Sequence, residues 1–465
     1  MVLAGPGSGK TSVIVERTAY MINEGKIPAS SILVVTFSRA AATEMKERFL
    51  KFVGQNRSEV TFGTFHGIFY GILKAAYHLS AANILSEEEK FSILREMTEK
   101  YGQEMAQEGD FIEEVAREIS VVKGNCISPE HYYASCCSDE IFRDIFHGYK
   151  QALKAKRKLD FDDMLVYTYE LLKERSDICR QWQEKFQYIL IDEFQDINHI
   201  QYEIVRMLSG DRKNLFVVGD DDQSIYRFRG ARPEIMLGFT KDYPEAEVIL
   251  LNVNYRSSRE IVEGSLRMIA NNTKRYDKEI RSEQPYVAPI CIHELKSPAE
   301  EAQDIRKQIQ IYHDRGIPYR EMAVIFRTNM DPRRTVNALM EYNLPFRMRD
   351  HLPNCYEHWI AKQILAYIRI AIGSKERVDY LQIWNRPKRY LRREWLSEGP
   401  VDLDRILEQV QDKAWAVEAI QKLNSDLNRL RKMAPFAAIN YIRKGIGYDQ
   451  YLSLIHISEP TRHSL

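Results

Sequence analysis

The residues best suited to chemistry begin in a glycine-rich stretch at positions 4–11, which reads AGPGSGKT. Backbone N–H groups of such a turn converge on phosphate oxygens, and the N-terminus of a following helix adds positive potential. We expect Lys10 to reach the β- and γ-phosphates of a nucleoside triphosphate and Thr11 to ligate Mg²⁺. The usual pattern opens with glycine, whereas this chain has the small Ala4, and the alternative is an ordinary glycine turn. The predicted phosphate-binding residues are Ala4, Gly5, Pro6, Gly7, Ser8, Gly9, Lys10 and Thr11.

A second candidate is an acidic run, DEFQD at residues 192–196, which directly follows the apolar residues 188–191. A carboxylate at a strand end that faces the phosphate loop gives Mg²⁺ a second protein ligand, so we assign Asp192 to the metal. Glu193 beside it is placed to take a proton from an attacking water as a general base. Alone, the run fits an acidic surface turn equally well, and the upstream phosphate loop favours the metal site.

The segment VGDDDQSIYRFRGA, residues 218–231, also follows an apolar run. A glutamine just past a strand end can contact the γ-phosphate and its water, and this role falls to Gln223. Tyr226 and Phe228 alternate with arginines, a pattern that suits single-stranded nucleic acid because bases stack on rings while phosphates meet the guanidinium groups. For Phe228, a place in the hydrophobic core is an equal alternative.

Two further residues follow predicted strands. Phe37 lies in TFSRAAATEM at the end of the second apolar run, where open α/β sheets bind ligands. His66 lies in GTFHG after the third run. A lone histidine is usually structural, so His66 is the weaker candidate for contact with nucleic acid.

The segment NVNYRSS at residues 252–258 lies where one α/β unit gives way to the next. An arginine in a cleft between domains can stabilise charge on a transferring phosphoryl group, and we assign this role to Arg256. Tyr255 could stack on a base. The alternative is an exposed turn with an incidental arginine. The basic run at 154–158 fits a solvated helix face better than a phosphate-binding surface.

Short apolar runs that alternate with helical patterns must position these residues. Their almost continuous hydrophobicity is typical of parallel strands covered on both faces, so we predict an α/β fold with a phosphate-binding parallel sheet. The predicted strands are residues 32–37, 60–65, 188–194, 215–220 and 248–253.

Helical segments interrupt and follow this sheet. Between about residues 75 and 158 the pattern predicts an inserted helical subdomain, with helices at 86–101, 111–122 and 140–158. Strand patterns return at 290–294 and 322–327, with an amphipathic helix at 300–315 between them, which indicates a second α/β unit. From about residue 373 the pattern is helical again, through 403–433.

Composition narrows the possible classes of protein. Lys and Arg together number 66, as do Asp and Glu, so any affinity for nucleic acid must come from local patches. No apolar run approaches the about 18–20 residues of a membrane span, and no signal peptide is visible. The six cysteines show no C-x-x-C spacing, so we expect free thiols rather than a zinc or iron–sulfur site. These features predict a cytoplasmic protein with no membrane partner.

Further segments join the motifs described above, all in a fixed order along the chain: LDFDDML at 159–165, AVIFRTN at 323–329, and residues 357–372 with RPKR at 386–389. Over about residues 1–395, the whole set resembles the UvrD/Rep/PcrA-type superfamily 1 DNA helicases. The resemblance implies two RecA-like motor subdomains with helical insertions, and ATP with Mg²⁺ in the cleft between the motors. It implies single-stranded DNA and duplex junctions as partners, with movement usually from 3′ to 5′.

The resemblance also assigns residues and boundaries. Phe37, His66, Tyr226 and Phe228 would contact DNA, and Tyr255 would stack on adenine; many relatives have tryptophan in place of Phe228. The implied subdomains are a first motor at 1–79 and 159–250, a helical insertion at 80–158, a partial second motor at 251–372 and a partial helical accessory subdomain at 373–452. Residues 453–465 match no continuation of the family, and we expect a non-native tail there.

The sequence departs from the family pattern near both of its ends and at one position of motif Ia. We find no upstream glutamine motif and no motifs V and VI, so we expect an incomplete second motor; the usual basic residue of motif Ia is Ala40. Three hypotheses stay open: an ATP-dependent DNA helicase that could serve repair, a truncated module that binds nucleotide and single-stranded DNA without unwinding, and the helicase subunit of a helicase–nuclease complex.

Overall fold

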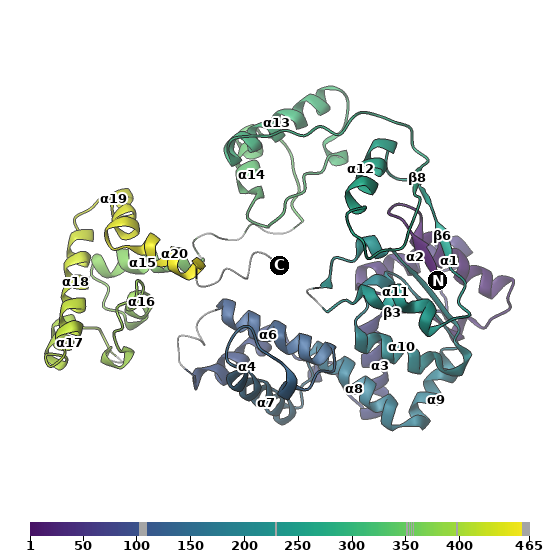
Figure 1. Cartoon of the computed structure of the whole chain (residues 1–465), viewed down its shortest axis with the longest axis horizontal. Helices are drawn as coiled ribbons and strands as arrows, with labels where there is room; N and C mark the ends of the chain where they lie inside the picture. Colours follow the sequence, from purple (N-terminus) through teal and green to yellow (C-terminus); the bar gives the residue numbers. More distant parts are fainter. Residues whose placement is uncertain are drawn as a thin grey trace. The chain divides into compact units, whose positions relative to one another are not determined.

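The structure, a computed structural model, describes residues 1–101, 109–227, 230–349, 352, 354, 356, 358–396 and 399–457. Phe228 lies outside these residues, as does most of the expected tail. The chain divides into two compact units, Met1–Cys291 and Ile292–Leu465 (Figure 1).

The first unit contains a six-stranded sheet in which every pairing is parallel. The predicted parallel α/β sheet is therefore confirmed. Its strand order is β3-β2-β4-β5-β1-β6, so the strand that leads into the glycine-rich loop lies inside the sheet rather than at its edge. The strands are β1 (Val2–Ala4), β2 (Ile32–Thr36), β3 (Thr61–Thr64), β4 (Tyr188–Ile191), β5 (Leu215–Gly219) and β6 (Ile249–Leu251).

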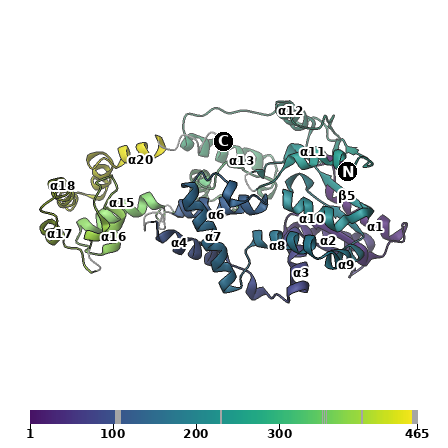
Figure 2. The same ribbon diagram turned by 60° about the horizontal axis from the view of Figure 1, so that its bottom comes forward.

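Helices cover both faces of this sheet (Figure 2). Side chains alternate along a strand, so Leu33 and Val35 join one apolar cluster while Ile32 and Val34 join the other. This two-sided burial explains the near-continuous hydrophobic runs. The Ile32 face packs against α1 (Lys10–Asn23) and α2 (Arg39–Val53), and the Leu33 face against α3 (Phe65–Tyr77), α8 (Phe161–Glu174), α9 (Ser176–Lys185), α10 (His199–Ser209) and α11 (Pro233–Asp242).

The predicted helical insertion forms around its own apolar cluster. Its helices are α4 (Glu87–Glu99), α6 (Gly109–Gly124) and α7 (Asp139–Lys156), close to the predicted bounds. Ser86 and Glu89 form a capping box that starts α4. Lys123 joins α6 to α8 through ion pairs of 2.7 Å with Asp160 and Asp163, and all three side chains are buried.

After β6 the first unit ends in a small second sheet. β7 (Val253–Asn254) pairs in parallel with β8 (Arg281–Ser282), and α12 (Arg259–Ile269) lies between them in sequence. The segment before β8, residues 275–280, packs beside the large sheet, because the Tyr276 hydroxyl donates to the carbonyl oxygens of Met236 and Leu237 in α11.

The second unit is helical. α13 (Pro298–Asp314) confirms the helix predicted at 300–315 and packs on α14 (Pro332–Glu341), where the Arg306 guanidinium lies 4.0 Å from the Tyr342 ring centre. The remaining helices share a core around Tyr367, Trp384 and Tyr448 and are α15 (Trp359–Ala371), α16 (Arg377–Ile383), α17 (Leu403–Gln409), α18 (Ala414–Leu430), α19 (Pro435–Asn440) and α20 (Tyr448–Ile457). The helical pattern predicted through 403–433 corresponds to two helices, α17 and α18.

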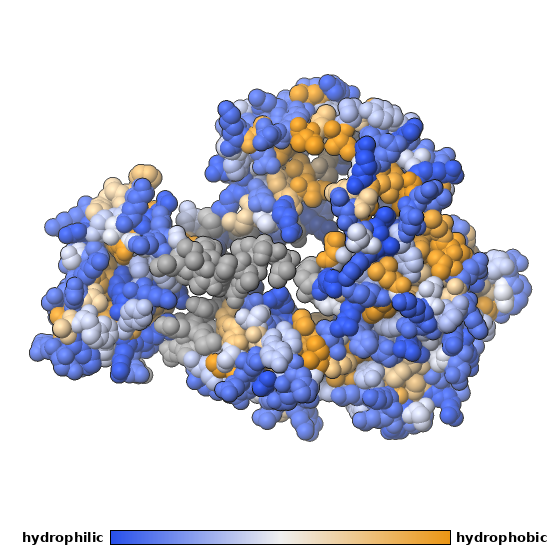
Figure 3. Space-filling model, in the orientation of Figure 1, coloured by the Kyte–Doolittle hydropathy of each residue, from blue (hydrophilic) through white to orange (hydrophobic). Residues whose placement is uncertain are grey.

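The strands predicted at 290–294 and 322–327 are wrong, because neither segment is a strand in the structure. Ile292 and Ile325 are 91% and 92% exposed. Figure 3 shows hydrophobic side chains at the surface around α13 and α14. An apolar run records only a preference for burial, whereas a strand also needs a neighbour to pair with its backbone. None of the described residues supplies that neighbour.

Within the described part of the chain, no helix has both the length and the apolar character that crossing a membrane requires.

Candidate nucleotide site and nucleic-acid surface

The glycine-rich loop joins β1 to α1. Gly7 and Gly9 have φ values of 66° and 90°, in the left-handed region that favours glycine. A Cβ at Gly9 would meet nothing within 4 Å, whereas one at Gly7 would lie 2.9 Å from Asn254 Oδ1. The Ser8 hydroxyl donates to the Gly5 carbonyl oxygen at 2.7 Å. Lys10 and Thr11 lie in the first turn of α1, directly after this loop, and Ala4 is buried at the end of β1.

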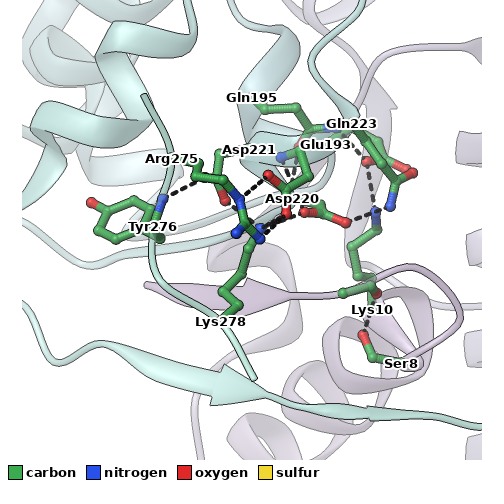
Figure 4. Close-up of polar contacts among 12 residues, drawn as sticks. Ser8, Lys10, Glu193, Gln195, Asp220, Asp221, Gln223, Arg275, Tyr276 and Lys278 are labelled. Carbon is green, nitrogen blue, oxygen red and sulfur yellow. Dashed lines mark hydrogen bonds and ion pairs between the residues drawn. The ribbon is translucent and has the colours of Figure 1, made fainter. Parts of the chain in front are cut away.

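Lys10 and Glu193 lie against each other. Lys10 Nζ is 3.3 Å from Glu193 Oε2, and the lysine side chain is only 12% exposed. Glu193 has φ 50° and precedes the short 3₁₀ turn Phe194–Asp196. This backbone conformation turns its side chain toward the loop (Figure 4).

Asp192 follows directly after β4 and is buried. Its carboxylate accepts the Glu193 N–H at 3.0 Å, while its own N–H donates to the Val35 carbonyl oxygen in β2. Burial raises the pKa of the carboxyl to about 6; the charge of Glu193 adds to the rise, and the Glu193 N–H and Lys10 oppose it.

Asp192 and Thr11 fit Mg²⁺ as a hard cation that takes oxygen ligands. No group of three or more His, Cys, Asp or Glu side chains among the described residues could hold a metal by itself. Mg²⁺ usually binds through one or two protein ligands, with waters and the phosphates of its substrate completing its coordination.

Gln223 and Glu193 belong to one hydrogen-bonded chain. Gln223 Nε2 donates to Asp220 Oδ2 at 2.6 Å, and the Asp220 N–H donates to Gln195 Oε1 at 2.9 Å. Gln195 Nε2 then donates to Glu193 Oε2 at 2.8 Å. A Cβ at Gly219 would lie 2.7 Å from Gln195 Oε1, so a glycine there makes room for this amide. Sequence analysis missed Gln195, although it lies inside the acidic motif.

A buried lysine with three aspartates lies next to this series of hydrogen bonds. Lys278 Nζ lies 2.7, 2.6 and 2.9 Å from carboxylate oxygens of Asp220, Asp221 and Asp222, and its side chain is fully buried (Figure 4). Burial alone would lower the pKa of Lys278, but the hydrogen bonds and charges of the aspartates outweigh it and raise the pKa. Arg275 adds two bonds of 2.7 Å to Asp222. Three adjacent acids after a buried strand need cations, and this was the available signal in the sequence.

The segment with Tyr255 and Arg256 is hydrogen-bonded to the glycine-rich loop. Asn254 Nδ2 donates to the Pro6 carbonyl oxygen at 2.7 Å, and the Tyr255 N–H donates to the Gly7 carbonyl oxygen at 3.1 Å. Asn254 Oδ1 in turn accepts the Arg256 N–H at 2.8 Å. The side chains of Tyr255 and Arg256 are exposed beside the loop. Asn254 is a further residue that sequence analysis missed.

Two aromatic pairs lie where β2 and β3 end. Phe37 and Tyr226 stack with ring centres 5.7 Å apart and planes 18° apart, and Phe37 is 39% exposed. His66 and Phe161 form a T-shaped pair with ring centres 5.6 Å apart. Burial lowers the pKa of His66, and the charge of Asp162 opposes this. Thr36 pairs with Thr64 in the sheet, so both pairs lie at the same edge. Phe161 was not predicted.

Comparison with known families gives two matches. The family described as UvrD/REP helicase N-terminal domain matches residues 1–244, and the UvrD-like helicase C-terminal domain matches residues 249–401.

Among individual proteins, the putative ATP-dependent DNA helicase YjcD of Bacillus subtilis is 33% identical, over 97% of this chain and 61% of its own length. The ATP-dependent DNA helicase PcrA of Staphylococcus aureus is 33% identical, over 87% of this chain and 55% of its own. The ATP-dependent DNA helicase Rep of Escherichia coli is 30% identical, over 97% and 70%. The chain thus spans between 55% and 70% of the length of these relatives. With its phosphate loop, acidic motif and parallel sheet, the chain belongs to the UvrD/REP helicase family.

Proposed function

We propose that this chain binds ATP with Mg²⁺ and hydrolyses it to move from 3′ to 5′ along single-stranded DNA and to separate duplex at a junction. The observation that carries the proposal is the hydrogen-bonded chain from Gln223 to Glu193, which ends on Lys10 of the phosphate loop. The relatives' names, ATP-dependent DNA helicases, support the choice of ATP and DNA.

Each site residue has a proposed role in binding or hydrolysing ATP. Lys10 and the loop N–H groups hold the phosphates, and Thr11 and Asp192 hold Mg²⁺. When bound, Mg²⁺ neutralises phosphate charge. Glu193 accepts a proton from the attacking water, Gln223 orients that water, and Arg256 stabilises charge that develops on the phosphoryl group.

The DNA path is proposed to run over the edge where the aromatic pairs lie. Phe37 offers exposed ring surface for bases, half-buried Tyr226 stacks on it, and His66 lies at the same edge. Phe228, which lies outside the described residues, is proposed to contact DNA as well. Tyr255, exposed beside the loop, would stack on adenine.

The test is ATP hydrolysis by the chain with and without oligothymidylate, followed by unwinding of duplexes with a 3′ or a 5′ single-stranded tail. We expect DNA to stimulate hydrolysis, Lys10→Ala to abolish it, and only the 3′-tailed duplex to be separated. Hydrolysis that Lys10→Ala leaves intact would refute the site, and unwinding from a 5′ tail would refute the direction.

A module that binds nucleotide and single-stranded DNA without unwinding is a second candidate for the 465-residue chain. It is favoured by the exposure of Ile292 and Ile325 in segments predicted to be strands of a second motor. If this candidate holds, DNA-stimulated hydrolysis or binding persists while duplexes with either tail stay intact.

A further inference from the structure

We propose that Lys278 is a positioning residue for hydrolysis, one that fixes Asp220 and, through Asp220, both Gln223 and Glu193. The inference rests on the proposed ATPase function. It concerns a residue outside the predicted site, in the segment that leads into β8.

The first step is the contact of Lys278 with Asp220. Nζ is 2.7 Å from Oδ1, and both side chains are fully buried. The other carboxylate oxygen of Asp220 accepts Gln223 Nε2 at 2.6 Å. Because a carboxylate only accepts, the amide must turn its nitrogen to Asp220, which sends its carbonyl oxygen the other way. A carbonyl oxygen can accept a proton of the attacking water, so the orientation of this amide bears directly on hydrolysis.

The second step leads from Asp220 to the general base. The Asp220 N–H holds Gln195 Oε1 at 2.9 Å, and Gln195 Nε2 holds Glu193 Oε2 at 2.8 Å. Any shift of Asp220 therefore moves the amide that orients Glu193. A misplacement of about 1 Å can cost about 100-fold in rate, so a residue without contact to the substrate can still control turnover.

The third step concerns charge. Asp220, Asp221 and Asp222 are consecutive and nearly buried, so their carboxylates repel one another in a medium of low dielectric. Lys278 contacts all three, whereas Arg275 contacts only Asp222. Removal of Lys278 leaves Asp220 without a cation, and an uncompensated buried charge moves or takes up a proton.

The segment around Lys278 also touches the phosphate loop. A Cβ at Gly5 would lie 2.3 Å from Ile280 Cδ1, so Ile280 packs directly on the loop. Residues 275–280 therefore contact both the glycine-rich loop and Asp220, the residue that accepts the hydrogen bond of Gln223. This segment is well placed to keep the loop and Asp220 in a fixed relative position.

The experiment compares wild type with Lys278→Met, Lys278→Arg and Lys123→Met. Lys123→Met is the matched control, because Lys123 is also a buried lysine between two aspartates, at 2.7 Å from each, and no hydrogen bond among the described residues leads from it to Glu193. The measurements are kcat and KM for DNA-stimulated hydrolysis, Kd for a fluorescent ATP analogue, and the unfolding temperature, with rates normalised to folded protein.

We expect Lys278→Met to lower kcat by about tenfold or more while the nucleotide Kd changes by less than about threefold. Lys278→Arg should recover part of kcat, and Lys123→Met should keep kcat within about twofold at a similar loss of stability. Gln223→Ala combined with Lys278→Met should be no slower than the slower single variant, because residues that act through one another are not additive.

A normal kcat for folded Lys278→Met, equal losses in Lys278→Met and Lys123→Met, or additive losses with Gln223→Ala would each overturn the inference. If Lys278→Met does not fold, Asp220→Asn takes its place, since it replaces one of the two carboxylate oxygens that join Lys278 to Gln223 with an amide nitrogen, which cannot accept; a normal kcat there would also overturn the inference. An inactive wild-type chain would instead refute the proposed function itself, so the two failures are distinguishable.

Discussion

Lys10 Nζ lies 3.3 Å from Glu193 Oε2, so the cation predicted to bind phosphate and the carboxylate predicted to accept a proton pair with each other. A phosphate group at the loop would compete for this lysine. Glu193 would then keep Gln195 as its partner and lose its ion pair with Lys10. On the proposed roles, this one ion pair would couple nucleotide binding to the freedom of Glu193 to act as a base.

This coupling predicts opposite effects of Glu193→Gln on binding and on turnover. The amide cannot take a proton, so kcat should fall by about 100-fold or more. Lys10 would lose its ionic partner and become available to phosphate, so the Kd for an ATP analogue should stay equal or decrease. Equilibrium binding and steady-state hydrolysis measure the two effects.

Glu16→Gln is the matched control for this variant, because Glu16 is exposed on α1 and its loss should leave both values unchanged. Weaker nucleotide binding by Glu193→Gln would contradict the competition between phosphate and Glu193 for Lys10.

The raised pKa of Asp192 predicts that Mg²⁺ binding depends on pH. The carboxyl has a pKa of about 6 in the folded chain. Below that pH it is protonated and must release the proton to bind the cation, so affinity should fall by about tenfold per pH unit below about pH 6 and level off above about pH 7. Mg²⁺ titrations of nucleotide binding across this range measure the slope.

Asp192→Asn provides the control, because it removes the titrating group while ATP titrates as before. The variant should bind Mg²⁺ weakly and show only the residual slope of the nucleotide. Identical slopes in wild type and Asp192→Asn would rule out Asp192 as the source.

The raised pKa of Asp196 predicts how Asp196→Asn changes the free energy of unfolding as the pH rises. Burial, with the charge of Glu193, raises the pKa of its carboxyl to about 6, and Oδ1 has no hydrogen-bond partner among the described residues. Because the folded value exceeds the unfolded value of about 3.9, its contribution is present at low pH and is lost as pH rises through about 6. Asp196→Asn should therefore gain about 1–1.5 kcal/mol relative to wild type between about pH 5 and about pH 8, because part of the loss has already occurred between the unfolded pKa and pH 5.

Urea unfolding at the two pH values measures this difference. Asp211→Asn, at an exposed site, should shift stability equally at both. A relative gain at the lower pH would mean that Asp196 is ionised and stabilised in the folded chain.

The first sheet and the glycine-rich turn between β1 and α1 were predictable because their signals are local. A strand, a glycine turn and a helix start follow one another within residues 2–11, and the acidic motif directly follows β4. Lys278 was not predictable by position, because it meets Asp220 across 58 residues of sequence and in no recognisable motif. The false strands at 290–294 and 322–327 fail for the same reason, since their apolar pattern is local and strand pairing is not.

The aromatic pairs at the ends of β2 and β3 predict that DNA binding can be weakened while nucleotide binding is unchanged. Phe37 stacks on Tyr226 and remains 39% exposed, so Phe37→Ala removes one ring of the surface proposed to hold bases. Base stacking on an aromatic ring contributes about 1–3 kcal/mol, so the Kd for oligothymidylate should rise by about 5- to 150-fold while the Kd for an ATP analogue stays unchanged. Phe52→Ala is the control, because Phe52 is 58% exposed at the far end of α2, the helix that begins just after Phe37. Fluorescence anisotropy with labelled oligothymidylate measures both variants, and equal losses in the two would mean that the edge at Phe37 has no special part in binding DNA.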